Sequence, residues 1–214
     1  MAGCSERMKK MKEESKFEQK KEELFRKITE LITKDGFEHI TIRGLCTEMG
    51  ISTGTFYHYF QNKNDLITVL FDDIDRYFAY TVREKFGEDE QENLRTFFHH
   101  YGVYIIRNGV ETCRCISVSP LTSRENDYLG EERGISTTLF GILCRGKEKG
   151  QFIRTLEPEK MTRMLLILAR GYSADWAKHN GAYDIIKELE QLSEFVLIPL
   201  QPVGEQIGKR MEKK

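Results

Sequence analysis

The chain has 214 residues, of which 39% are hydrophobic and 31% are charged, and this composition excludes an intrinsically disordered protein. Its formal net charge is −1, so overall charge gives no indication of nucleic-acid binding, and any such function has to come from a local motif. No apolar run approaches the length that crosses a bilayer.

The first residues, MAGCSERMKKMKEESK, are polar and lack the apolar region of a secretory signal, so we expect a cytoplasmic protein. Residues 1–16 are expected to form a flexible arm. Its basic side chains would either remain solvated or reach a DNA minor groove; they are Arg7, Lys9, Lys10 and Lys12. A flexible tail is expected at 204–214.

Five cysteines occur, and their spacing gives neither a disulfide framework nor a CxxC metal site. We interpret them as ordinary free thiols, and we expect no cofactor and no metal. A thiol-based redox or metal sensor built on Cys113, Cys115 and Cys144 stays open as an alternative.

Helices are predicted almost throughout, because prolines are few and apolar residues recur at helical spacing. The first runs near 18–34 and ends before Gly36. Its inward face is formed by Leu24, Phe25, Ile28, Leu31 and Ile32.

The next window, 37–66, reads FEHITIRGLCTEMGISTGTFYHYFQNKNDL and holds two short helices around a turn. Thr41 is a candidate N-cap for the first of these helices, and Gly50 can take the positive φ that ends it. Ser52 is a candidate N-cap for the second, which runs from Thr53 to about Phe60. This is the layout of a helix-turn-helix, whose second helix lies in the DNA major groove.

Within the second helix, Phe56 and Phe60 are four residues apart and are expected to pack inward. The remaining side chains are short polar groups or flat aromatic rings that suit phosphates and base edges: Thr53, Thr55, Tyr57 and His58. The alternative is that all of these residues only pack a small three-helix domain.

The window strongly resembles the DNA-binding domain of TetR-family transcriptional regulators, through TIRGLC, GISTGTFYHYF and QNKNDL. The resemblance implies that the second helix faces the operator through Thr53, Gly54, Thr55, Tyr57 and His58. It implies a phosphate contact for Lys63, and it places Thr41 and Arg43 beside the DNA backbone. It covers about thirty residues. The domains expected are a helix-turn-helix domain at 17–62 and a larger helical domain at 63–203 for ligand binding and dimerisation.

A long helix near 63–86 is expected to connect the two domains, with one apolar stripe of Leu66, Leu70, Ile74, Phe78 and Val82. An aromatic helix follows and closes at Asn108-Gly109. Further helices are expected near 123–149, from Pro158 to about 179, and at 184–198 with Asp184 as N-cap.

The last two helices carry apolar residues on more than one side. Residues 164–169 read MLLILA, and the final helix has one row containing Leu189 and Val196 and another containing Ile186 and Leu197. A helix of this kind has to be covered from two directions. We therefore expect a homodimer, and in the resembled family these two helices pair with their copies in a four-helix bundle.

The larger domain is rich in aromatic residues, which typically line small-molecule cavities. We predict an apolar effector pocket between the helices at 63–86, 89–108 and 158–179. Its proposed lining is Phe78, Phe97, His100, Tyr101, Tyr104, Phe140, Tyr172, Asp175 and Trp176. The alternative is that these rings fill a solid core, with His100 and Asp175 held by local hydrogen bonds or ion pairs.

The function expected is therefore that of a ligand-responsive transcriptional regulator that binds double-stranded DNA. We expect a repressor, released from an inverted-repeat operator by a small hydrophobic effector. An adaptor or DNA-organising protein is the remaining alternative. The sequence contains no P-loop, nucleophile elbow or H-E-x-x-H, so an enzyme is not expected.

Overall fold

The computed structural model describes residues 23–202 apart from 25 and 123–129, and every regular element in these ranges is helical. The first helix spans residues 23–35. In chain order the others are η1 (Phe37–His39), α2 (Ile42–Met49), α3 (Thr53–Tyr59), η2 (Lys63–Asp65), α4 (Leu66–Arg76), η3 (Tyr77–Val82), η4 (Arg83–Lys85), α5 (Glu90–Thr122), α6 (Gly134–Glu148), α7 (Pro158–Lys178) and α8 (Ile185–Leu200).

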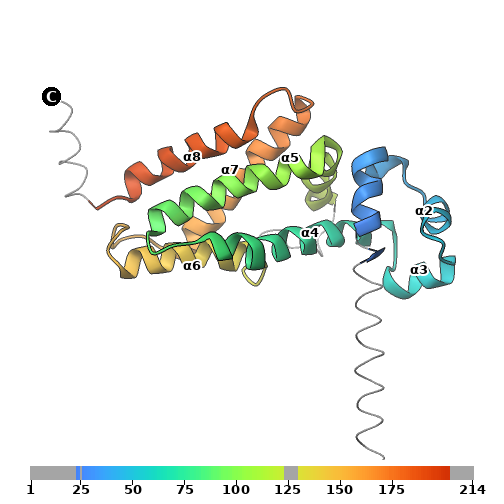
Figure 1. The fold of residues 1–214 in the computed structure, drawn as a ribbon, viewed down its shortest axis with the longest axis horizontal. Helices are drawn as coiled ribbons and strands as arrows, with labels where there is room; N and C mark the ends of the chain where they lie inside the picture. Colours follow the sequence, from blue (N-terminus) through green and yellow to red (C-terminus); the bar gives the residue numbers. More distant parts are fainter. Residues whose placement is uncertain (1–22, 25, 123–129, 203–214) are drawn as a thin grey trace, which may run out of the picture.

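The molecule has two hydrophobic cores. Figure 1 shows the corresponding two parts, a small group of helices with α2 and α3 and a larger bundle with α5 to α8. The head, residues 23–65, packs the first helix, α2 and α3 around the smaller core, with Ile28, Ile32 and Phe56 fully buried at its centre. The body, residues 83–202, packs α5, α6, α7 and α8 around the larger core. The all-helical fold with a small helix-turn-helix unit and a larger helical part confirms the predicted fold class.

α4 connects the head to the body because its side chains belong to both cores. Leu66 and Leu70 are buried in the small core, whereas Ile74 is buried in the large one. The apolar stripe then continues through Phe78 and Val82, both fully buried. The backbone departs from the single α-helix expected here, because Tyr77–Val82 forms a π-helical turn and Arg83–Lys85 a 3-10 turn. π-helical turns inside longer helices often occur at functional sites.

α5 has a kink at the point where the sequence predicted its end. Gly109 has φ 76° and ψ 176°, a conformation that glycine adopts readily, and the Asn108 side chain donates a hydrogen bond to the Tyr104 carbonyl at 2.9 Å. The chain then resumes a helical course as far as Thr122, which the sequence analysis did not predict. In this second part Cys113 is buried in the large core, whereas Cys115 and Ile116 are buried in the small core.

α6 begins at Gly134, so the predicted start near 123 was wrong for residues 130–133, which form a turn. The earlier part of that prediction, 123–129, lies outside the described residues. Arg133 precedes the helix with extended backbone, φ −66° and ψ 143°. The first turn of α6 packs tightly against α4, since a Cβ at Gly134 would lie 2.6 Å from the Asp75 carbonyl oxygen.

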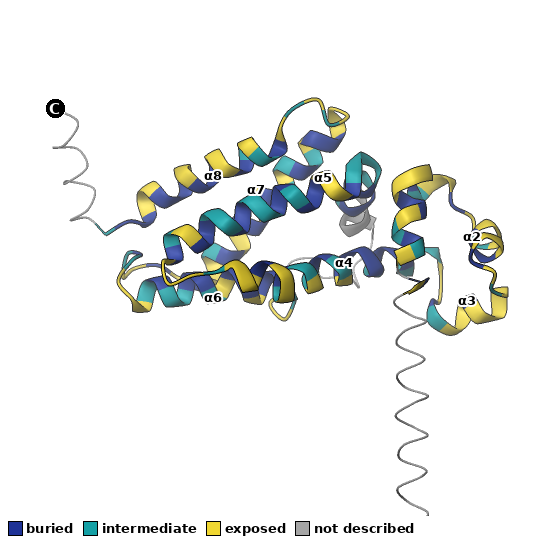
Figure 2. Cartoon of the chain, viewed as in Figure 1, coloured by how far each residue is buried: buried dark blue, intermediate teal, exposed yellow. Residues whose placement is uncertain are grey.

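α7 and α8 form the last antiparallel pair of the body. The N-cap predicted at Asp184 is confirmed, because its carboxylate accepts a hydrogen bond from the Lys187 backbone at 3.2 Å. The buried row of α8 includes Leu189 and Val196, as predicted, but Leu197 is buried too. Figure 2 shows buried and exposed residues alternating along α8 and α6.

Candidate DNA-binding and effector sites

The ends of α2 are fixed by the residues that the sequence singled out. The Thr41 hydroxyl accepts a hydrogen bond from the Gly44 backbone at 3.1 Å. Gly50 has φ 65°, and the next residue, Ile51, donates its backbone hydrogen bond to the Cys46 carbonyl at 2.9 Å. This left-handed glycine turns the chain so that α3 starts three residues later, at Thr53.

α3 is anchored from its inner side by Phe56, which is fully buried against the ring of Phe60 at a centroid distance of 5.2 Å. Its start is fixed by Ser52, whose hydroxyl accepts a hydrogen bond from the Thr55 backbone at 3.0 Å. The cap and the buried ring fix the rotation of the helix, so the opposite side is held outward.

The outer surface of α3 carries every residue that the sequence assigned to base and phosphate contacts on this helix. These residues are all exposed: Thr53, Gly54, Thr55, Tyr57 and His58. Tyr57 is 56% exposed although the small core lies directly beneath it. A seven-residue helix that presents polar and aromatic groups to solvent on one side has the geometry of a major-groove recognition helix.

Three further predicted contacts flank α3. Lys63 donates a hydrogen bond from Nζ to the Glu38 carbonyl at 3.3 Å and lies 4.5 Å from the centroid of the Phe37 ring, which orients its ammonium group. Thr41 and Arg43 are both exposed at the start of α2. These positions stay predictions as DNA contacts.

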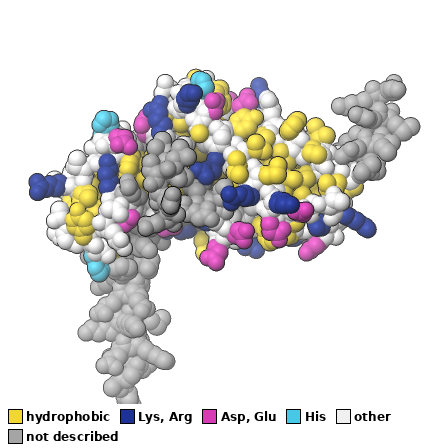
Figure 3. Space-filling view, turned by 180° about the vertical axis from the view of Figure 1, so that it is seen from behind, with side chains coloured by type: hydrophobic (Ala, Val, Ile, Leu, Met, Phe, Trp, Pro, Cys, Tyr) yellow, Lys and Arg dark blue, Asp and Glu magenta, His cyan; other side chains and the backbone are white. Residues whose placement is uncertain are grey.

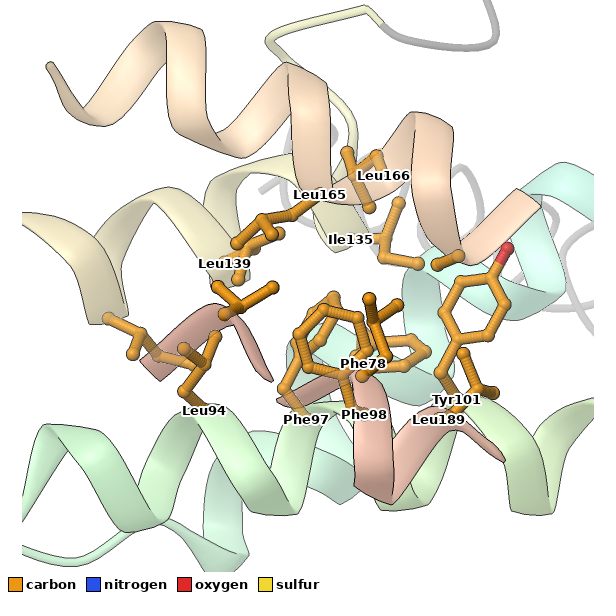
Figure 4. Packing of buried hydrophobic residues seen from close by; sticks show 14 of the residues in the cluster. Phe78, Leu94, Phe97, Phe98, Tyr101, Ile135, Leu139, Leu165, Leu166 and Leu189 are labelled. Atoms are coloured by element: carbon orange, nitrogen blue, oxygen red, sulfur yellow. The ribbon is translucent and has the colours of Figure 1, made fainter. Parts of the chain in front are cut away.

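Most of the aromatic side chains that were predicted to line an effector pocket instead pack together in the large core. Phe78, Phe97, Tyr101 and Tyr104 are at most 3% exposed, and the Phe78 and Phe97 rings lie 4.6 Å apart. Figure 4 shows several of these rings converging with aliphatic side chains from neighbouring helices. Aromatic residues at helical spacing fill a core as readily as they line a pocket, and here they fill the core.

His100 and Tyr77 form a polar pair at the edge of this core. The Tyr77 hydroxyl lies 2.9 Å from His100 Nδ1. Burial lowers the pKa of His100, and the nearby charges of His99 and Lys85 lower it further, so the imidazole is neutral near pH 7. The pair joins the π-helical turn of η3 to α5.

Asp175 and Trp176 lie near the end of α7, where both contact Tyr183. The Asp175 carboxylate accepts a hydrogen bond from the Tyr183 hydroxyl at 3.1 Å, and the Trp176 indole donates to the Tyr183 carbonyl at 2.9 Å. Asp175 and Tyr172 border an open hollow of about 360 Å³. Trp176 is buried beside it.

A cavity of about 440 Å³ lies between α6 and α7 and is more enclosed than that hollow. Of the predicted effector residues, Phe140 contributes to its wall. The other described lining residues are Glu131, Ser136, Thr137, Glu159, Lys160, Thr162, Arg163 and Leu166. These residues could not be predicted, because nothing in their spacing distinguishes a cavity wall from an ordinary helix surface.

The start of α6, which forms part of this cavity wall, is tied directly to α4. Asp75 accepts hydrogen bonds from the Ile135 backbone at 3.0 Å and from Arg133 Nε at 2.9 Å. Arg133 also donates to the Phe71 carbonyl at 3.1 Å, and its guanidinium lies 4.8 Å from the Phe71 ring centroid. The first turn of α6 is therefore bonded directly to α4, whose first half is buried in the core of the head.

Apart from the cavity, an exposed apolar surface lies on α7 and α8. We define the C-terminal face by its five large exposed hydrophobic residues, Met164, Ile167 and Leu168 on α7 and Phe195 and Ile198 on α8. Phe195 is 72% exposed. Figure 3 shows hydrophobic side chains gathered on this side of the body. A contiguous apolar patch of this kind typically marks an interaction surface.

Among the described cysteines, Cys46, Cys113 and Cys115 are buried and Cys144 is half-buried. Burial raises the pKa of both Cys113 and Cys115 to about 12 and also raises the pKa of Cys144. Reactive thiols have lowered pKa values and access to solvent, so these positions lack the features of a redox sensor. The part of the chain that the structure describes contains no cluster of three potential metal ligands. Nor does that part contain a helix long and apolar enough to cross a membrane.

Comparison with known proteins agrees with this geometry. Residues 24–70 match the family model described as "Bacterial regulatory proteins, tetR family". The fatty acid metabolism regulator protein of Bacillus subtilis is 20% identical, with 73% of this chain and 83% of the relative covered.

Solved structures of similar fold cover nearly the whole of their own chains. FadR from Thermus thermophilus, a TetR-family repressor solved in complex with lauroyl-CoA, has a TM-score of 0.66 at 22% identity and covers 85% of this chain and 95% of its own. FadR from Bacillus subtilis, solved in complex with stearoyl-CoA, has a TM-score of 0.62 at 18% identity and covers 83% and 98%. At this identity the structural likeness concerns the fold.

Proposed function

We propose that this chain, which belongs to the TetR family of bacterial regulatory proteins, is a dimeric repressor that leaves its operator when a small apolar effector binds the body. The observation that carries the DNA-binding part is α3. Its buried Phe56 and capping Ser52 hold four polar or aromatic side chains and Gly54 outward, where a groove can receive them. We propose a regulator rather than an enzyme.

The dimer supplies the spacing that an inverted-repeat operator requires. We propose that the C-terminal face pairs with its own copy about a two-fold axis, which covers Phe195, Ile198 and the exposed residues of α7. Two recognition helices would then enter successive major grooves about 34 Å apart. A monomer would contact only one half-site.

The effector step requires that ligand binding and DNA binding favour different conformations. The cavity between α6 and α7 is the candidate effector site, because its lining combines the apolar Phe140 and Leu166 with the charged Lys160 and Arg163. The relatives solved with lauroyl-CoA and stearoyl-CoA support an effector with a long apolar part. We propose a fatty acyl compound.

The route from this cavity to DNA runs through Asp75 and Arg133. An effector that displaces the first turn of α6 would pull on both contacts and rotate α4, whose first half is buried in the core of the head. The two heads of a dimer would then change their separation. In this coupling Arg133 is a positioning residue, because it holds α6 against α4 without touching the effector or the DNA.

The DNA-binding part is tested by Lys63→Ala, measured by fluorescence anisotropy with a selected operator at several salt concentrations. Loss of one phosphate contact should weaken binding and lower the magnitude of the salt slope by about one unit. Lys178→Ala is the matched control, because this exposed lysine at the C-terminal end of α7 lies outside the helix-turn-helix, so its loss should leave affinity and slope unchanged. If both variants have the same operator affinity and the same salt slope, the proposed docking of α3 and Lys63 on DNA would be contradicted.

A further inference from the structure

One buried hydroxyl in the body has no hydrogen-bond partner. Ser136 is 3% exposed, and its Oγ is the one buried side-chain oxygen or nitrogen without a partner in the ranges that the structure describes. Leaving a buried hydroxyl unpaired is unfavourable, and native proteins avoid it except where a water or a ligand completes the bond. The position of Ser136 therefore calls for a specific explanation.

The neighbouring hydroxyls of the same helical turn are satisfied. Thr137 Oγ1 and Thr138 Oγ1 donate to the Gly134 carbonyl at 3.1 and 2.6 Å. Across the cavity Thr162 donates to the Pro158 carbonyl at 2.8 Å. Ser136 is thus the exception among these side chains, and it forms part of the wall of the 440 Å³ cavity.

The rest of the cavity wall specifies the kind of molecule that could supply the missing partner. Phe140 and Leu166 are apolar. The charged lining groups are two acids, Glu131 and Glu159, and two bases, Lys160 and Arg163, so their charges balance. Such a site has no net charge to neutralise a buried ion, and a neutral hydrogen-bonding group suits the hydroxyl better than a carboxylate or an ammonium.

We infer that this cavity binds the acyl part of a fatty acyl ester or thioester, and that Ser136 Oγ donates a hydrogen bond to its carbonyl oxygen. The inference rests on the proposed function, because it assigns to the effector site a chemical class and the residue that recognises it. Ser136 also lies two residues after Gly134, where α6 touches Asp75. Occupation of the hydroxyl would therefore act on the turn that is tied to α4.

The test compares two soluble probes with the full-length protein by isothermal titration calorimetry. S-octanoyl-N-acetylcysteamine is a neutral thioester, and S-octyl-N-acetylcysteamine is its thioether without the carbonyl. Wild type should bind the thioester about tenfold more tightly, the upper range expected for one net hydrogen bond. Ser136→Ala should bind both probes equally, with the affinity of the wild type for the thioether.

Ser193→Ala is the matched control, since Ser193 is equally buried and its hydroxyl already donates to the Glu190 carbonyl at 2.7 Å. This variant should keep the tenfold preference. Thermal unfolding without ligand separates the two serines further: Ser136→Ala should raise Tm slightly by removing an unsatisfied hydroxyl, whereas Ser193→Ala should not.

Equal affinities of wild type for the two probes, no binding of either, or an unchanged preference in Ser136→Ala would each overturn the inference. A water molecule as the only partner of Ser136 would give the last of these results. Operator binding by the ligand-free protein is measured in parallel. If the protein binds its operator but the probe results are negative, the assignment of the effector site to Ser136 fails, and the proposed function as a DNA-binding regulator is retained. If the protein binds no DNA, the proposed function itself is rejected.

Discussion

α3 and the first part of α5 are both rich in aromatic residues, but they use them in opposite ways. α3 buries Phe56 and leaves Tyr57 at 56% exposure, whereas α5 buries Phe97, Phe98 and Tyr101 almost completely. An exposed ring adds little to the stability of the core, and on the outer side of α3 it is available to a partner outside the chain. A buried ring is explained by stability alone. The comparison separates side chains kept for binding from those kept for folding.

The sharpest way to break this comparison is to truncate two adjacent residues of α3. Phe56→Ala should destabilise the head by about 3–5 kcal/mol, because it leaves a cavity in the small core. Tyr57→Ala should change stability by less than about 0.5 kcal/mol and yet abolish specific operator binding. Urea unfolding and fluorescence anisotropy measure the two effects.

Tyr80→Ala controls for the loss of an exposed tyrosine, since this residue is 70% exposed and lies on η3, away from the head. It should leave both stability and DNA affinity unchanged. If Tyr80→Ala loses as much DNA affinity as Tyr57→Ala, the claim that α3 is the recognition helix would be contradicted.

A second pair of changes extends the comparison to the C-terminal face. The double variant Phe195→Asp and Ile198→Asp should convert the dimer to a monomer, because two charges would be buried without partners in the interface. The monomer should remain folded, since neither side chain belongs to the core. Light scattering gives the mass and circular dichroism the fold.

For the dimer prediction, Tyr80→Asp is the control for an added charge at an exposed aromatic position outside this face. It should stay dimeric. A wild type that is monomeric at micromolar concentration would contradict the interface before any variant is made.

A smaller effect is expected on the pH dependence of stability, through Glu90 at the N-terminal end of α5. Burial acts to raise the pKa of Glu90, but hydrogen bonds from Arg145, Asn93 and Lys149 outweigh it, and the pKa lies below its ordinary value of 4.5. These bonds therefore stabilise the fold above pH 4.5, and the contribution is lost as pH falls through the lower folded pKa. Glu90→Gln should lower Tm by roughly 3–6 °C at pH 7 and by less near pH 3.

Glu88→Gln serves as its matched control, because Glu88 is fully exposed and shares only Lys149 with Glu90. Differential scanning calorimetry should show little change for this variant at either pH. A constant Tm difference between wild type and Glu90→Gln at all pH values would show that the loss comes from packing rather than charge.

The smallest effects are expected at the cysteines. Because burial raises the pKa of Cys113 and Cys115 to about 12, native protein at pH 7.5 should react with iodoacetamide at these positions far more slowly than unfolded protein. Mass spectrometry of timed samples measures the rates. Rapid native labelling would revive the thiol-sensor alternative.

The head could be predicted from the sequence because its determinants are local. Thr41, Gly50 and Ser52 each fix a helix end through bonds to residues within about five positions, and all three appear in the structure as expected. The C-terminal face was anticipated in part, since 164–169 is exposed on one side. Its α8 row was misassigned, however: Phe195 and Ile198 are exposed, whereas Leu197 is buried.

The effector site could not be predicted in the same way. Whether Tyr101 or Phe140 borders a cavity depends on how α6 and α7 separate, and that depends on contacts between residues far apart, such as Asp75 with Arg133. Hydrophobic spacing specifies which side of a helix is inward and contains no information on gaps between helices. Ser136 was identified as a candidate only because its buried hydroxyl has no hydrogen-bond partner in the structure.

The central claim is that two copies of this chain present two α3 helices to one inverted repeat. It is tested most directly by selecting bound sequences from random double-stranded DNA and weighing the complex by native mass spectrometry. We predict that the wild type enriches an inverted repeat and that the complex with this DNA contains two protein copies. The Tyr57→Ala variant should not enrich this sequence. No enriched sequence, or a single copy bound to a site without symmetry, would contradict the account.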